Sequence, residues 1–137
     1  MNEIESYNDG RPKKVSEPIS GLLVEYAYSG NSRISTITNE RNKSNFKTVL
    51  TEELIGDRYV TLESEEFGDT YHIIKKYSKK GEEFYYNQTN LKTNKVYKKI
   101  TKWQDGNPCI WTSEYGEEKS VGFYLQKSIL TGLTKNF

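Results

Sequence analysis

The chain has 137 residues and a mass of 15.9 kDa, which is enough for one domain with one core and too little for two. Hydrophobic residues make up only 34%, but 11 tyrosines raise the aromatic share to 13%, which argues against disorder. The net charge of +1 excludes a globally basic nucleic-acid-binding protein. Any electrostatic function must therefore be local.

The first twenty residues are polar and contain Pro12 and Pro18, so we expect an irregular leader over residues 1–20 and a single domain over residues 21–137. The opening residues lack the apolar run of a signal peptide, which predicts a cytoplasmic protein. The longest apolar run, 21–27, is interrupted by Glu25 and is far shorter than the roughly 20 residues of a membrane helix. We expect no membrane association.

From residue 22 onward, runs rich in Tyr, Val, Ile, Thr and Phe alternate with clusters of Gly, Asn, Asp, Ser and Lys, which is typical of strands and turns. Expected strands are 22–28, 33–38, 46–50, 58–63, 70–77, 83–88, 95–102, 109–114 and 120–126. Connections this short join antiparallel neighbours. The prediction is a mainly β, single-domain antiparallel meander, either a twisted sheet or a small β-barrel, with at most one or two short helices, at 43–54 and 126–133.

One cysteine and one histidine limit the catalytic chemistry. Cys109 has no second cysteine for a disulfide, and His72 alone would leave a zinc site to the carboxylates. The two residues lie on different expected strands, whereas a nucleophile and its base must be in contact. We expect both to be structural, and we predict no enzymatic activity, no cofactor and no metal.

Charge is segregated along the chain. Residues 52–69 hold seven acids and one base, and residues 70–102 hold nine lysines and two acids. One interpretation is that adjacent strands pair these charges across a solvated face. The other is that the acidic segment binds a basic partner, with charges steering association and aromatic rings anchoring it. The hypothetical partner-binding residues are Glu63, Glu65, Glu66, Asp69, Tyr59 and Phe67.

A short sequence pattern recurs near both ends of the chain. Tyr7-Asn8-Asp9-Gly10-Arg11-Pro12 matches Trp103-Gln104-Asp105-Gly106-Asn107-Pro108 as aromatic, amide, Asp, Gly, polar and Pro. The segment 7–38 resembles the tyrosine-aspartate (YD) repeats of Rhs proteins, in which Tyr, a Gly-Arg turn and an apolar-polar strand recur.

With this pattern and its segregated charge, the chain resembles bacterial immunity proteins encoded beside Rhs or contact-dependent growth inhibition toxins. The resemblance implies a cytoplasmic protein that binds its cognate toxin domain, commonly a nuclease, and occludes the active site. Two alternatives stay open: a lipocalin-like β-barrel that encloses a small apolar ligand, and a β protein that binds single-stranded nucleic acid through its lysines and tyrosines. Nucleic acid is the lesser expectation, because the segment 70–102 has lysine without arginine.

Overall fold

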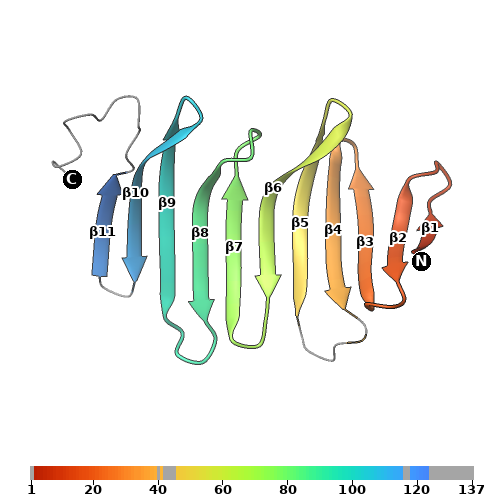
Figure 1. The fold of residues 1–137 in the computed structure, drawn as a ribbon, viewed down its shortest axis with the longest axis horizontal. Coiled ribbons are helices and arrows are strands. Elements are labelled where there is room, and N and C mark those ends of the chain that lie inside the picture. The colour runs from red at the N-terminus through yellow and green to blue at the C-terminus, as the bar shows by residue number, and fades with distance from the viewer. Residues whose placement is uncertain (1, 40, 42–45, 116–117, 124–137) are drawn as a thin grey trace.

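Eleven antiparallel strands form one sheet, and their order in the sheet follows the chain from β1 to β11 (Figure 1). The computed structural model describes residues 2–39, 41, 46–115 and 118–123. The strands are β1 (Glu3–Ser6), β2 (Pro12–Glu17), β3 (Leu22–Ser29), β4 (Ser32–Asn39), β5 (Lys47–Ile55), β6 (Arg58–Phe67), β7 (Tyr71–Tyr77), β8 (Glu83–Asn90), β9 (Val96–Gln104), β10 (Asn107–Tyr115) and β11 (Glu118–Phe123). The predicted antiparallel meander is confirmed.

The sheet is open: each strand pairs only with its neighbours in the chain, and β1 does not pair with β11. The twisted sheet is therefore the correct alternative of the two predicted, and the small β-barrel is not formed. None of the described segments is a helix that is long and apolar enough to span a membrane.

One local prediction was wrong, and one helix candidate is not formed. Lys47–Ile55 form β5, which confirms the strand expected over 46–50 in place of the candidate helix over 43–54, because the β-branched residues Thr48, Val49 and Thr51 fit a pleated strand between two neighbours. The leader expected to be irregular contains β1 and β2, and Pro12 occupies the first position of β2, where a strand tolerates proline. The second helix, expected over 126–133, lies outside the described residues.

Five hairpin turns lie on the same edge of the sheet, the upper edge in Figure 1, and each contains a glycine with positive φ. These glycines are Gly10, Gly30, Gly56, Gly81 and Gly106, with φ values from 59° to 88°. Glycine reaches this left-handed region without the steric penalty of a Cβ atom. The last four of these glycines follow one another at intervals of 25 or 26 residues. The repeating unit of the sheet is therefore a hairpin of two strands.

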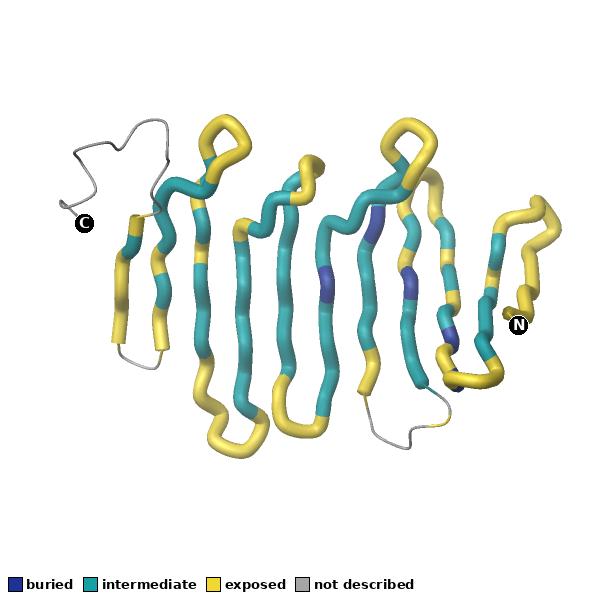
Figure 2. The backbone as a smooth tube through the Cα atoms, viewed as in Figure 1, coloured by how far each residue is buried: buried dark blue, intermediate teal, exposed yellow. Residues whose placement is uncertain are grey.

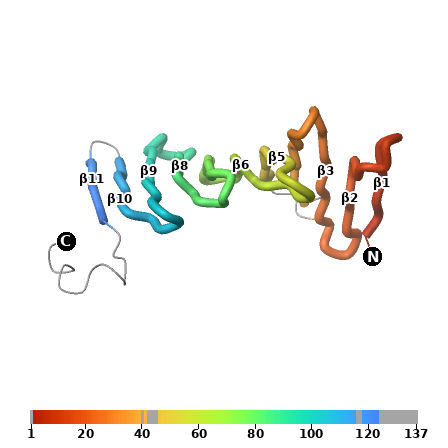
Figure 3. Tube along the Cα trace, turned by 90° about the horizontal axis from the view of Figure 1, so that it is seen from above, coloured from red at the N-terminus to blue at the C-terminus, as the bar shows by residue number. Residues whose placement is uncertain are grey.

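The sheet is one layer thick, as the edge-on view in Figure 3 shows. Leu23 is the only buried hydrophobic side chain of the described residues, and Figure 2 shows that most positions in the central strands are only half-buried. The whole chain exposes 9829 Å². A compact monomer of this mass exposes about 7,400 Å², roughly a quarter less.

A sheet in which each strand pairs through its backbone only with its sequence neighbours is expected to lose structure from its ends. We expect backbone amides of β1 and β11 to exchange with solvent deuterium at least tenfold faster than those of β5 to β8, because an end strand has a single neighbour. Hydrogen exchange followed by mass spectrometry measures this. Uniform protection across all strands would instead indicate one cooperative unit.

Candidate binding faces

The strand register divides the side chains between two faces of the sheet. Residues paired across antiparallel strands point the same way, so Tyr28, Arg33 and Glu52 share one face, and Ala27 and Ile34 share the other. Followed across all strands, the register places every tyrosine and tryptophan of the described strands except Tyr85 on the first face. We call it the aromatic face, and its rings are Tyr26, Tyr28, Tyr59, Tyr71, Tyr77, Tyr86, Tyr97, Trp103, Trp111 and Tyr115.

The opposite face carries most of the charged side chains of the strands, and we call it the charged face. Its charged residues are Glu3, Glu5, Lys14, Glu25, Lys47, Glu53, Arg58, Glu63, Glu65, Lys76, Lys98, Lys102, Glu114 and Lys119. The carboxylates predominate from β1 to β6, and the lysines predominate from β7 to β11. The segregation seen along the sequence is therefore also a segregation across this face.

An arginine held between two tyrosine rings organises the first half of the aromatic face. The Arg33 guanidinium lies 3.8 Å from the ring centroid of Tyr59 and 4.7 Å from that of Tyr26. Its Nε and Nη2 each donate a hydrogen bond of 3.0 Å to the carboxylate of Glu52, which is only 7% exposed. The Ser35 hydroxyl donates to the same carboxylate. Burial lowers the pKa of Arg33. The hydrogen bonds and the charge of Glu52 outweigh this effect, so the pKa of Arg33 lies above its ordinary value.

The first hairpin packs against this cluster through a second arginine. The Arg11 guanidinium lies 4.2 Å from the centroid of the Tyr28 ring, and its Nε donates a hydrogen bond of 2.7 Å to Asp9. The Tyr28 hydroxyl donates to the Pro12 carbonyl at 2.8 Å, and the Tyr7 hydroxyl donates to the Tyr26 carbonyl at 2.9 Å. These contacts fix the turn between β1 and β2 to strand β3.

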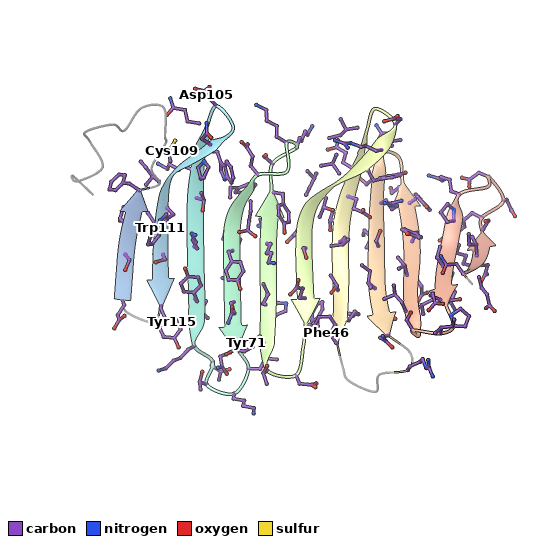
Figure 4. The ribbon with its side chains drawn as sticks, viewed as in Figure 1. Phe46, Tyr71, Asp105, Cys109, Trp111 and Tyr115 are labelled. Atoms are coloured by element: carbon purple, nitrogen blue, oxygen red, sulfur yellow. The ribbon has the colours of Figure 1, made fainter. Side chains whose placement is uncertain are left out.

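Lysines and rings alternate on the second half of the aromatic face. The Lys75 ammonium lies 5.8 Å from the Tyr86 centroid, and that of Lys99 lies 5.4 Å from Trp111. Tyr86 and Tyr97 meet edge to face at 6.0 Å. Burial, and then the nearby carboxylates of Glu66 and Glu83, raise the pKa of Tyr86 above its ordinary value. Figure 4 shows Trp111 and Tyr115 on β10, the outermost strand but one.

The sequence-predicted partner site does not form one surface. Glu63, Glu65 and Phe67 point to the charged face, whereas Tyr59 and Glu66 point to the aromatic face. Asp69 lies in the turn between β6 and β7. Because β6 is paired on both sides, these acids lie in the middle of the sheet and not along an edge.

His72 and Cys109 lie far apart. His72 is on β7 and Cys109 on β10, and two strands separate them, which corresponds to about 14 Å at the usual strand spacing. The His72 Nε2 is 2.7 Å from a carboxylate oxygen of Glu65, a contact that the sequence pattern did not indicate. In the described part of the chain, no group of three or more potential ligands could hold a metal ion.

No protein-family model, no curated protein and no solved structure matches this chain. Its functional interpretation therefore depends on its own residues and their arrangement.

Glu52→Ala should lower the free energy of unfolding by about 3 kcal/mol, because it leaves the guanidinium of Arg33 half-buried without its anion. Urea denaturation measures this change. The matched control is Glu53→Ala, because Glu53 is the next residue in β5 and points to the opposite face. Its side chain is 32% exposed, and its ion pair with Lys79 is a long contact of 3.7 Å. That change should stay within about 0.5 kcal/mol. Equal losses for the two variants would contradict the role assigned to the Arg33 cluster.

Proposed function

We propose that this chain is a binding protein that neutralises a bacterial toxin domain by covering its active site, and that the contact is made by the aromatic face. The observation that supports this most directly is the gathering of almost all strand tyrosines and both tryptophans on one face of a single-layer sheet. Tyr, Trp and Arg are the residues enriched at the energetic centres of protein interfaces.

The rings are held in place before any partner arrives. Tyr86 is fixed by its neighbour Tyr97, by Lys75 and by a hydrogen bond of 2.5 Å to Gln88. The Trp103 indole donates a hydrogen bond of 2.8 Å to the Glu83 carbonyl. An interface whose side chains are already ordered loses less conformational entropy on binding.

The extent of the face suits occlusion. Eleven strands at about 4.8 Å spacing, each about 25 Å long, give a face of roughly 1,300 Å². A standard protein complex buries about 800 Å² on each partner. The aromatic face is therefore wide enough to cover the mouth of an active site on a domain of similar size. A protein that blocks the toxin's active site in this way needs no catalytic residues of its own.

Binding of single-stranded nucleic acid is a second candidate, supported by the alternation of Lys75 and Lys99 with Tyr86 and Trp111 on the same face. Phosphates would contact the lysines and bases would stack on the rings. The ligand-enclosing barrel loses its structural basis because the sheet is open.

Coexpression with the product of the adjacent gene tests the proposal. The wild-type chain should restore growth to cells that express this toxin. Tyr86→Ala and Trp111→Ala should each weaken the purified complex by about 2 kcal/mol, roughly thirtyfold in Kd, because aromatic rings buried in an interface carry much of the binding energy. Calorimetric titration measures the Kd.

Thr112→Ala is the matched control, since Thr112 follows Trp111 in β10 but points to the charged face. It should leave the Kd unchanged. Because Trp111→Ala can also loosen β10, Tyr97→Phe supplies a variant that keeps the ring in place and should bind almost as wild type. Failure of the wild-type chain to bind the toxin, together with salt-sensitive binding of a single-stranded oligonucleotide, would favour the second candidate.

A further inference from the structure

Within residues 2–39, 41, 46–115 and 118–123, no second layer covers the charged face, although such a layer normally completes a β domain. Domains bury their sheets against another sheet or against helices. Here apolar side chains of this face stay exposed, among them Ile34 at 45%, Ile100 at 40% and Val121 at 63%. We expect a second protein surface to cover this face, and the charge pattern of the face indicates which surface that is.

One row of side chains crosses the whole charged face at the same height. The strand register places these residues side by side, from β1 to β11: Glu5, Lys14, Glu25, Thr36, Val49, Glu65, Ile74, Asn87, Lys98, Glu114 and Lys119. The charges read minus, plus, minus at the β1 end and plus, minus, plus at the β11 end. Four neutral residues and Glu65 lie between. The row is therefore antisymmetric about β6, the central strand.

We propose that a second copy of this chain covers the charged face, related by a two-fold axis that runs parallel to the strands and lies midway between the two sheets, over β6. This rotation reverses the strand order and preserves the height along each strand, so β3 of one copy faces β9 of the other. Glu25 then meets Lys98 of the second copy. Likewise Lys14 meets Glu114, and Glu5 meets Lys119. An antisymmetric charge row is self-complementary under a two-fold axis, which is the commonest symmetry of homodimers.

The rows on either side of this one fit the same operation. In the next row Ile34 faces Tyr85 of the second copy and Ala27 faces Ile100. In the adjacent row on the opposite side of the charge row, Leu23 faces Val96 and Thr38 faces Thr89. The two Phe67 rings meet at the axis. The apolar residues of these two rows thus face apolar or aromatic residues, while Lys76 faces Thr51 and Lys47 faces His72. The pairs of opposite charge lie in the row between them.

Two carboxylates, Glu63 and Glu65, meet their own copies near the axis. Within the same protomer, Lys76 lies opposite Glu63 in the register, and the His72 ring contacts the Glu65 carboxylate at 2.7 Å. Packed sheets cross at about 30°, which offsets facing residues increasingly away from the axis. The long side chains of Glu and Lys reach across such an offset.

The area is sufficient for a stable dimer. A face of roughly 1,300 Å² on each copy would bury about 2,600 Å² in total, which lies within the range of obligate homodimers. The aromatic faces then lie on the two outer surfaces of the sandwich. Self-association and the proposed partner contact therefore use opposite faces. An experiment that contradicts one of these two proposals leaves the other unaffected.

A charge swap within one chain tests the dimer. The wild type should sediment at twice its mass of 15.9 kDa. Glu25→Lys and Lys98→Glu should each raise the dimer Kd at least tenfold at low salt, because each reversal creates two repulsive pairs per dimer. The double variant Glu25→Lys/Lys98→Glu should return the Kd to within about threefold of wild type. Sedimentation equilibrium at two salt concentrations measures all four proteins.

The restoration cannot arise inside one protomer, because residues 25 and 98 lie six strands apart, about 29 Å. Lys75→Glu, on the aromatic face, is the control and should leave the dimer unchanged. A wild-type chain that stays monomeric at about 100 µM in low salt would overturn the proposal, as would a double variant no tighter than the single ones.

Discussion

A single layer of sheet can shield a side chain only with its neighbours on the same face. No second sheet or helix contributes a covering surface in the described chain, and Leu23 alone among its hydrophobic residues is buried. Wide, flat side chains meet this constraint best, because a ring lying along the sheet covers several backbone positions at once. Tyrosine adds a hydroxyl that tolerates the water on its outer side. The richness in tyrosine and the low hydrophobic share of the sequence are therefore consequences of the same geometry.

The Arg33 cluster shows how such a sheet makes a substitute for a core. A guanidinium is planar and stacks on rings while its edge stays free for hydrogen bonds, so Arg33 covers Tyr26 and Tyr59 and still pairs with Glu52. A lysine at this position would supply the charge without the flat surface. In the second half of the face, where Lys75 and Lys99 take the place of arginine, the ammonium groups lie farther from the rings, at 5.8 and 5.4 Å.

The meander was predictable because glycine turns and short β-branched runs are local signals. The faces were harder to predict. Simple alternation along a strand separates Glu65 from Glu66, and applied to the sequence alone it divides the proposed acidic site between two faces. Relating one strand to the next requires the register, which shifts at bulges such as the one at Leu62 of β6, opposite Thr51 and Glu52. The sequence does not mark these bulges, so the tyrosines of distant strands could not be assigned to a common face.

A meander of repeated hairpins has a further property that bears on the proposed role in binding a partner. Because strands pair only with their sequence neighbours, adding or removing a hairpin at an end of the sheet changes the width of both faces and keeps the pairing of the remaining strands. Side chains that alternate along one strand belong to different faces, so substitutions at Tyr86 and at Asn87 act on different surfaces although the residues are adjacent. The aromatic face can therefore adapt to a partner while the charged face keeps its self-complementary pattern. A fold with one enclosed core would couple the two, since every inward substitution would alter the packing that both surfaces share.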